Sequence, residues 1–474
     1  MIWRLADGIR LEENVRGAVL VSRRPLRMLR LNSALLALVR QLPVVNTCQL
    51  TPAQVKALEL LAGKGFVERS WQGLEDLPAP PCVSIIIPVK DRAEDLRQCL
   101  TSLQQLNYPA DKLEVLVVDD GSSDATPDVA RQLGAHLLHS GAVGGGPALA
   151  RNKGAAIACG DILAFIDSDC SAHPDWLQDL LPVFADPEVA AVGGWVDGMF
   201  LGSALDRYEA VMSSLNLGRR EMSGGHGDDT FYLPSCNLLI RRSAFVDAGG
   251  FRTELHVGED VDLTWRLRDN GWNIKYLPRG TVYHAHRSFL WPFMKRRFDY
   301  GTSEGILHRL HPVRGKKMVL PPMLTAILFL LVGILVSGFA WLLVPVLALL
   351  IVDMLRSRRR MLKMEMPFSP AEILLARLRA LGSLGYYIGY HLLRYYLVPL
   401  ALVSLWLPQV AVLLAVLLCG VATVDFRVRK PRINLFQFCF FYTMEQLSYG
   451  LGVLRGCFGI GSVASYALDF KFVS

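Results

Sequence analysis

Four continuous apolar runs alternate with amphipathic stretches in the first half of the chain. They read VSIIIPV, LEVLVVDD, DILAFIDSD and VAAVGGWV. Runs of this length with no polar alternation are typical of strands that are covered on both faces. Helical patterns separate them, so we predict an α/β domain with a parallel sheet over residues 82–315.

Residues 1–75 have a different pattern. Short runs such as GAVLVSRRPLRMLRL predict strands, and the helical patterns NSALLALVRQL and TPAQVKALELLAGKGF follow. Thr51 and Pro52 are suited to the N-cap and the first position of the second helix. Gly63 or Gly65 would end that helix before a further strand. This order predicts a small winged-helix-like module, followed by a linker at 76–81.

Two uncharged apolar blocks lie near the C-terminus, at about 320–352 and 396–424. Each is longer than the roughly 20 residues of one membrane span. Basic clusters flank both blocks: RGKK before the first, RSRRR between them and RVRKPR after the second. If positive charge marks the cytoplasmic side, each block is a hairpin that turns near Gly338 or at Pro408-Gln409.

Two other arrangements of these blocks stay open. The helices could re-enter or lie on the membrane, or each block could be one long tilted span, which would place RSRRR outside. We therefore predict membrane-associated helices over 316–432. The aromatic, glycine-rich segment 433–474 is expected to form amphipathic helices against the membrane or the α/β domain.

Composition narrows the class of protein. The 474 residues carry a net charge of +7, with 52% hydrophobic and 20% charged residues. This excludes disorder and is not the charge of a nucleic-acid coat. The nine cysteines include no C-x-x-C pair, which argues against a zinc finger or a secreted disulfide scaffold. The first residues contain no apolar signal-peptide core, so a cytoplasmic setting is expected.

Acidic residues follow the first two strands of the predicted sheet. Pro88 and Asp91 end the first, and Asp119 and Asp120 end the second in DDGSSD. Ligands of α/β sheets bind at the carboxyl ends of strands. Carboxylates there can accept from a uracil N–H or a ribose hydroxyl, but they would repel phosphate. We predict a nucleoside end, the alternative being a plain polar turn.

Two further motifs extend this crevice. GGGPALARNKG permits close backbone approach and directs Arg151 toward the crevice, although no Walker G-K-[ST] follows. FIDSD places Asp167 and Asp169 at the end of an apolar strand, where the turn lets both reach one ligand. Hard oxygen ligands suit Mg²⁺ or Mn²⁺, either of which can neutralise a departing diphosphate.

HVGEDVDLTWRL opens a helix with Glu259 and Asp260. Acidic residues there can simply stabilise the helix dipole. Alternatively, one carboxylate is a general base and its neighbour holds the helix. The downstream YHAH offers His284 and His286, either of which could instead be a structural histidine.

Together IIIPVKD, VVDDGSSD, ARNKG, FIDSD and GEDVDLTWRLRDNGW, with the downstream histidines, resemble the family 2 glycosyltransferases over about residues 82–300. The resemblance implies the GT-A fold of nucleotide-diphospho-sugar transferases. It also implies metal-dependent, inverting transfer of a sugar from a nucleotide-diphosphate donor. The implied roles are donor binding by Pro88, Asp91, Asp119 or Asp120, Arg151 and Asp167, metal binding by Asp169 and by His286 or less readily His284, and base catalysis by Asp260 with Glu259 beside it.

The chain departs from the family at KRRFDYG, where processive members carry Q-x-x-R-W. Without that Gln and Trp, synthesis of a long polymer is less expected. Arg297 in this segment could still bind the diphosphate bidentately, or meet anionic lipid.

The N-terminal pattern resembles the peptide-binding modules of ribosomal-peptide maturation systems, which bind a leader peptide along a strand edge. The whole order of module, GT-A domain and apolar helices resembles the glycosyltransferases of the mycofactocin system. The resemblance implies transfer of β-1,4-linked glucose from UDP-glucose to that peptide-derived redox cofactor or its precursor. Residues 1–75 would then bind a precursor peptide, and no nucleic acid would be a partner.

Three alternatives remain. The N-terminal module could be a cap without a ligand. The enzyme could act on a lipid carrier or a cell-surface polysaccharide, which the apolar blocks favour. The chain could also be a membrane-tethered binding protein with an inactive transferase fold, but the retained carboxylates Asp120, Asp169 and Asp260 argue against that.

Overall fold

The computed structural model describes residues 2–14, 17–23, 26–44, 50–70, 77, 79–141, 144–225, 229–363 and 368–472. Positions 76 and 78 of the predicted linker lie outside these ranges. The chain forms two compact units, each described by itself. The sheet unit comprises residues 73–317 and 390–469, and the hairpin unit comprises residues 1–72, 318–389 and 470–474.

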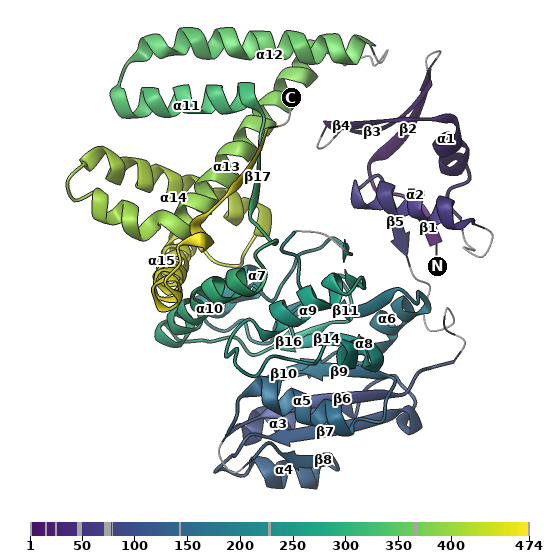
Figure 1. Ribbon diagram of the computed structural model, residues 1–474. Helices are drawn as coiled ribbons and strands as arrows, with labels where there is room; N and C mark the ends of the chain where they lie inside the picture. Colours follow the sequence, from purple (N-terminus) through teal and green to yellow (C-terminus); the bar gives the residue numbers. More distant parts are fainter. Residues whose placement is uncertain are drawn as a thin grey trace. The chain divides into compact units, whose positions relative to one another are not determined.

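An eight-stranded sheet forms the core of the sheet unit, in the order β13-β15-β11-β14-β9-β6-β7-β8. Its strands β9, β6, β7 and β8 follow one another in Figure 1. The four apolar runs of the sequence contribute β6, β7, β9 and β11. The sheet is mixed, because β14 lies antiparallel to both β9 and β11. The strands are β6 (Val83–Val89), β7 (Leu113–Asp119), β8 (His136–His139), β9 (Ile162–Ile166), β11 (Val189–Gly193), β13 (Met222–Gly224), β14 (Asn237–Arg241) and β15 (Asn273–Tyr276).

Helices pack closely against this sheet. Helix α5 begins with Pro147 at its first turn, and its Gly154 lies so near β6 that an added Cβ would come within 2.6 Å of Ile86. Ile86 and Phe165 are fully buried in the same core. The remaining helices here are α3 (Ala93–Leu103), α4 (Thr126–Gln132), α5 (Pro147–Ile157), α6 (Trp176–Leu180), α7 (Ala204–Met212), α8 (Arg242–Asp247) and α9 (Glu259–Asp269).

A second, three-stranded sheet in this unit has the order β10-β16-β12. Its strands are β10 (Cys170–Ala172), β12 (Val196–Gly198) and β16 (Val282–His284). The antiparallel register pairs Cys170 with His284. This pairing brings the YHAH motif beside the end of the FIDSD motif, more than a hundred positions earlier in the chain.

Two long helices of the sheet unit, α10 (Leu290–Leu310) and α15 (Leu435–Ile460), are joined by a seam of glycines. Each helix carries a G-x-x-x-G pair, Gly301 with Gly305 on α10 and Gly452 with Gly456 on α15. Cβ atoms added at Gly301, Gly452 or Gly456 would overlap the backbone of the facing helix. Small residues at this spacing let helix backbones approach closely.

The hairpin unit begins with a three-stranded antiparallel sheet in the order β2-β3-β4. Helix α1 is capped by Asn32, which accepts from Leu35 N at 2.8 Å, and Thr51 and Gln54 form a capping box on α2. The winged-helix identity of this module stays a prediction. Its elements are β1 (Ile2–Leu5), β2 (Ile9–Asn14), β3 (Gly17–Arg23), β4 (Leu26–Leu31), α1 (Ser33–Arg40), α2 (Pro52–Gly63) and β5 (Val67–Ser70), with β5 paired to β1.

Both faces of this small sheet are covered. Leu20 faces the module's own helices, in one core with Trp3 and Leu58. Val19 and Val21, which point to the other face because side chains alternate along a strand, pack with Met361 and Ile373.

Met361 and Ile373 belong to apolar helices of the same unit. Helix α11 (Pro322–Ser337) turns at Gly338, whose φ is +71°, into α12 (Leu343–Lys363). Helix α13 (Pro370–Val403) follows, with residues 370–389 in this unit and residues 390–403 in the sheet unit. Two short strands close the unit, β17 (Lys317–Leu320) and β18 (Asp469–Phe472).

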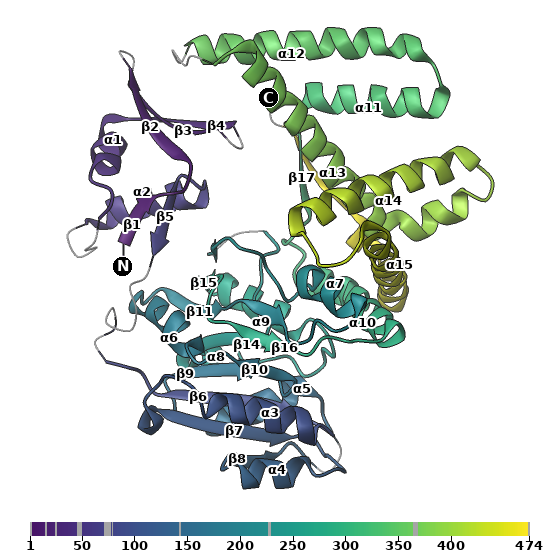
Figure 2. The same ribbon diagram turned by 180° about the vertical axis from the view of Figure 1, so that it is seen from behind.

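Two helical stretches are long and apolar enough to cross a membrane, Ala340–Lys363 and Pro408–Arg429. Only 11% and 22% of their most apolar windows are buried, so most of these side chains lack protein cover. Leu405 and Trp406, in the turn between α13 and α14 (Pro408–Arg429), are 73% and 77% exposed. Figure 2 shows α11–α12 and α13–α14 as two helical hairpins.

Candidate active site

A cavity of about 840 Å³ lies within the sheet unit. Its walls come from the carboxyl ends of β6, β7 and β9, from the first turns of α5 and α9, and from α10, α13 and α15. Of the residues singled out from sequence, it is lined by Pro88, Asp120, Arg151, Asp167, Asp169, Glu259, Asp260, His284, His286 and Arg297.

Asp120 is held by the glycine-rich loop before α5. Its two carboxylate oxygens accept from Gly145 N and Gly146 N, each at 2.8 Å, and the Ser140 hydroxyl also donates to it. Burial favours a higher pKa for Asp120, but these hydrogen bonds outweigh burial and lower the pKa. The loop therefore keeps an ionised acceptor at the β7 end of the cavity.

Asp91 and Asp119 brace the DDGSSD turn and are not among the residues that line the cavity. Asp91 accepts from Ser123 N at 2.7 Å. Asp119 accepts from Ser122 N at 3.1 Å and lies 3.2 Å from His139 Nδ1. In this structure the two side chains hold the loop that carries Asp120.

Arg151 joins two parts of the site. Its guanidinium donates to Asp167 at 2.6 Å and to Glu259 at 2.9 Å, and the residue is only 3% exposed. Burial favours a higher pKa for Asp167, but Arg151 outweighs burial and the pKa is lowered. Arg151 thus fixes the end of β9 to the start of α9 with its charge already paired.

Asp260 is a partly buried carboxylate on the cavity wall. Its oxygens accept from Ser235 N at 3.1 Å and from its neighbour Val261 N at 2.8 Å. Burial, and then the charge of Glu259, raise the pKa of Asp260 to about 7. A carboxylate of this basicity is suited to general-base catalysis near neutral pH.

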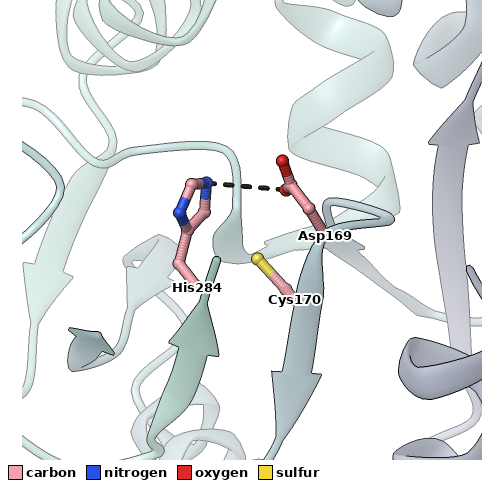
Figure 3. A group of neighbouring side chains, drawn as sticks. All are labelled: Asp169, Cys170 and His284. Atoms are coloured by element: carbon pink, nitrogen blue, oxygen red, sulfur yellow. Dashed lines mark ion pairs between the residues drawn. The ribbon is translucent and has the colours of Figure 1, made fainter. Parts of the chain in front are cut away.

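Asp169, Cys170 and His284 form a group whose potential ligand atoms lie within 4.8 Å of one another (Figure 3). His284 Nε2 is 3.5 Å from Asp169 Oδ1. Burial raises the pKa of Cys170 well above the usual value, so its sulfur is a thiol, a poor metal ligand. The other oxygen of Asp169 accepts from Arg92 at 3.0 Å.

The residues present fit a divalent cation. A carboxylate oxygen and an imidazole nitrogen, Asp169 Oδ1 and His284 Nε2, converge there, and both are ligand types that Mg²⁺ or Mn²⁺ accepts. His286 lines the cavity, with its ring centroid 4.8 Å from that of His284. Burial lowers the pKa of His286 to about 2, so this imidazole is neutral. The geometry places His284, rather than His286, beside Asp169.

Arg297 and its neighbour Arg296 face different surroundings. Arg297 is 3% exposed, donates to Glu209 and lies 3.5 Å from Glu445. Burial raises the pKa of Glu209 to about 7. Arg296 lies over the Tyr300 ring at 4.8 Å on the cavity wall.

Arg92 and Arg296 are site residues that the sequence reasoning did not single out. A signal for Arg296 was available, because it lies one helical turn before Tyr300. Arg92 offered no comparable pattern, because its approach to Asp169 depends on the packing of two distant loops.

Known proteins that are similar to this chain show its family. The model of glycosyl transferase family 2 matches residues 84–248. The glycosyltransferase AglE of Haloferax volcanii is 34% identical over 231 residues, which are 47% of this chain and 73% of AglE. The chain belongs to glycosyl transferase family 2. The residues that match the family model lie in the α/β sheet unit.

Among its family 2 relatives is the pre-mycofactocin glycosyltransferase of Mycobacterium tuberculosis, 38% identical over 253 residues. The match covers 51% of this chain and 52% of that protein, so the chain spans about half the length of this relative. A solved structure, the mannosyltransferase PcManGT of Pyrobaculum calidifontis in complex with GDP-Man and Mn²⁺, is 18% identical. It has a TM-score of 0.47 and covers 83% of this chain and 91% of its own.

Proposed function

We propose that this family 2 enzyme is an inverting, metal-dependent hexosyltransferase that adds β-1,4-linked glucose from UDP-glucose to mycofactocin or its precursor. The observation that carries the proposal is the Asp260 carboxylate, whose pKa is raised to about 7. It shares one cavity with the Asp169–His284 pair. Similarity to the pre-mycofactocin glycosyltransferase supports the choice of acceptor.

The proposed reaction is a single displacement. The acceptor oxygen attacks the anomeric carbon from the face opposite the nucleotide, and Asp260 takes the hydroxyl proton. The bond to the diphosphate breaks with its electron pair, so UDP leaves and the anomeric centre inverts. Backbone N–H groups of Ser235 and Val261 hold the Asp260 oxygens in place.

The donor would lie across the strand ends. We assign Pro88 and Asp120 to the nucleoside, Asp167 to the ribose, and Arg296 with Arg297 to the diphosphate side. Asp169 and His284 would hold Mg²⁺ or Mn²⁺, which supplies positive charge opposite the departing diphosphate.

The test is turnover of UDP-glucose, against other nucleotide sugars, by the full chain in detergent with Mn²⁺ or Mg²⁺ and with the mycofactocin precursor as acceptor. Products are identified by mass. Asp260→Asn should lower transfer by about 10²- to 10⁴-fold, the usual contribution of a general base. Asp128→Asn, which changes an exposed carboxylate on α4, is the matched control. Near-full transfer by Asp260→Asn would contradict the base assignment.

A second candidate function is transfer to a lipid carrier or a cell-surface polysaccharide. Beta-monoglucosyldiacylglycerol synthase of Trichormus variabilis is 28% identical over 214 residues, which are 42% of this chain and 43% of that protein. The two long apolar helices also favour it. Hexose found only in the lipid extract of the reaction would support this second candidate.

The apolar hairpins suggest how the enzyme is held at the cytoplasmic membrane, with its catalytic domain (82–315) facing the cytoplasm. The 16 residues of α11 extend about 24 Å at 1.5 Å per residue, less than the roughly 30 Å of a hydrocarbon core. We therefore propose that α11–α12 enters and leaves the membrane on one side.

We also propose that residues 1–75 bind a precursor peptide. β2 and β4 are the two edges of the module's sheet, and an edge strand can accept a further strand through its backbone groups. Binding of the mycofactocin precursor peptide by the full chain, measured by fluorescence anisotropy, tests this. No measurable affinity would leave the module with a structural role.

A further inference from the structure

Exposed apolar side chains gather where α7, α10 and α15 begin. Six of them, from the loop before α7 and the first turns of the two long helices, define what we call the apolar patch: Phe200, Leu201, Phe289, Trp291, Phe436 and Phe440. Phe289, Trp291 and Phe436 are 76%, 75% and 84% exposed. Elsewhere in the described residues of 82–315, exposed large hydrophobic side chains stand singly, at Ile157, Val246 and Val313. Single exposed residues are ordinary on a protein surface, but a cluster marks a site of contact.

Buried aromatic rings hold the three segments of the patch together. The Tyr208 ring of α7 lies 6.1 Å from the Phe293 ring of α10 and 5.2 Å from the Phe438 ring of α15. Phe289 lies one helical turn before Phe293, and Phe436 lies two residues before Phe438. The three helices lie side by side in both views (Figure 1, Figure 2). The patch is therefore one surface and not three separate loops.

The residues around the patch are basic. Residues 426–444, which lead from α14 into α15, contain no Asp or Glu, and neither do residues 287–298, which lead into α10. Arg207 of α7 donates to the Arg432 carbonyl at 3.4 Å, which joins the first of these stretches to the loop before α7. Four exposed cations end α14 or directly follow it: Arg427, Arg429, Lys430 and Arg432. The surface thus combines exposed aromatic rings with positive charge.

Helix α14 leads directly to this surface. From Pro408 to Val424 it has no charged residue, and only 22% of its most apolar window is buried. The four cations stand where this apolar stretch ends, and Phe436 follows Arg432 by four residues. Aromatic and basic residues at the end of an apolar helix are typical of the level of lipid headgroups.

We infer that the apolar patch lies in the headgroup layer of an anionic membrane. Its rings would enter among the upper acyl carbons, and anionic headgroups would supply the negative charge that this part of the chain lacks. The inference rests on the membrane location within the proposed function, but not on the proposed reaction. Arg296, on the cavity wall, follows Trp291 by five residues, about 8 Å along the helix. The patch would therefore hold the cavity close to the lipid surface.

The experiment places a fluorescent reporter on the patch of the full chain. Phe436→Trp and the control Val246→Trp each add one tryptophan at an exposed apolar position of the sheet unit. Both are reconstituted into vesicles of phosphatidylglycerol and phosphatidylcholine, with or without bromine near the headgroup end of the chains. Bromine should quench about half of the fluorescence added by Phe436→Trp and little of that added by Val246→Trp, because interfacial side chains lie only about 5–10 Å deep.

A charge variant tests which lipid the patch meets. In vesicles of phosphatidylcholine alone, the quenching at Phe436→Trp should be about twofold weaker, because the attraction to the cations is missing. Changing Arg429 and Arg432 to Gln should lower the quenching with phosphatidylglycerol to the same level. The matched control changes Arg97 and Arg131, exposed arginines of α3 and α4, and should have no effect. Equal quenching in both lipids would overturn the preference for an anionic membrane.

The outcomes separate two failures. If the chain floats with the vesicles but Phe436→Trp is quenched no more than Val246→Trp, the inference is overturned while the membrane location stands. If Phe436→Ser converts a dimer in detergent into a monomer, the patch is a contact between two copies, and the inference is again overturned. If the chain does not float with vesicles at all, the membrane location fails and the inference fails with it. Turnover of UDP-glucose is judged by its own assay.

Discussion

Asp260 illustrates how its surroundings set the chemistry of one side chain. The carboxylate is partly buried next to Glu259, and both effects disfavour its ionised form. Arg151 is near, but its guanidinium is engaged by Asp167 and Glu259. Glu259 is therefore the carboxylate that pairs with Arg151, and Asp260 keeps its raised pKa, a division of roles that pairs of acidic residues commonly show at active sites.

This basicity predicts a pH dependence. A general base must be unprotonated, and the pKa of Asp260 is raised to about 7, so kcat/KM should rise with pH and level off above about 7. Below that pH the activity should fall about tenfold per pH unit. The measurement is kcat/KM for glucosyl transfer between pH 5 and 9 at saturating Mn²⁺. A profile that is flat from pH 5 upward would contradict the assignment.

The neighbouring histidines give a second prediction at this scale. Because His284 Nε2 lies 3.5 Å from Asp169, His284→Ala should raise the Mn²⁺ concentration for half-maximal activity by about 10- to 100-fold, and His286→Ala should raise it less. Mn²⁺ binding followed by electron paramagnetic resonance provides a readout independent of turnover. A larger loss of affinity in His286→Ala would reverse the assignment.

The two histidines also mark how far sequence reasoning reaches for the site. Motif spacing was sufficient to predict that Asp120, Asp169 and Asp260 lie at one cavity, because strand ends and helix starts meet at one edge of such a sheet. It favoured His286 over His284 as the metal ligand, whereas the structure brings His284 to Asp169, because the register of β10 against β16 pairs Cys170 with His284. Nor could it show that the charges of Arg151 and Arg297 are paired with buried carboxylates.

Among the helices, α10 and α15 pack so closely that their contact requires glycine. Gly301, Gly452 and Gly456 each face the backbone of the other helix, where a Cβ would overlap main-chain atoms. Backbone on both sides leaves no flexible side chain that could move aside. The seam also carries one wall of the cavity, so stability and the shape of the cavity depend on the same contact.

A substitution in this seam should be strongly destabilising. Gly452→Val should lower the free energy of unfolding by about 1–3 kcal/mol or more, the usual cost of overpacking. Gly459→Val, on the same helix but with only the far end of Arg455 at 3.8 Å, makes the same change where there is room. The midpoint of thermal unfolding in detergent measures both. Equal losses in the two variants would show that helix propensity, and not the seam, is responsible.

The local sequence pattern predicted several strands and one helix start. The apolar runs gave β6, β7, β9 and β11, and Thr51 with Pro52 marked the start of α2. The antiparallel position of β14 between β9 and β11 was not foreseen, because its short apolar run does not show which strands it will pair with. Partners of a strand are set by long-range packing, which periodicity does not encode.

For the whole molecule, chain order and spatial grouping differ. Residues 1–72 form one compact unit with residues 318–389 and 470–474. The reason is visible at β3, where Val19 and Val21 pack with Met361 and Ile373. Sequence reasoning divides a chain where composition changes, so it could not foresee that the N-terminal module packs with the apolar helices more than three hundred positions later.

Three exposed arginines of the hairpin unit predict that it binds anionic lipid. Arg358, Arg359 and Arg360 are exposed on α12, and each such charge near an anionic surface contributes about 1 kcal/mol. Changing all three to Gln should weaken binding to phosphatidylglycerol-containing vesicles by about 100-fold at low salt. It should leave binding to pure phosphatidylcholine vesicles nearly unchanged. Co-flotation of the full chain with each vesicle type measures both.

The matched control changes Arg219 and Arg220 to Gln, because these are exposed arginines of the sheet unit. Screening by high salt should remove the difference between the two vesicle types. Equal binding of the triple variant and the wild type at low salt would contradict a role for this cluster at the membrane.

The bond between Glu304 and the Tyr449 hydroxyl joins positions 145 apart in the chain. At a synthesis rate of about 5–20 residues per second, α10 leaves the ribosome on the order of 10 seconds before α15 exists. During that interval the nascent chain holds the strands and loops to which we assign donor binding but lacks one wall of its cavity. Translation itself would therefore delay the onset of transfer until the last long helix has been made.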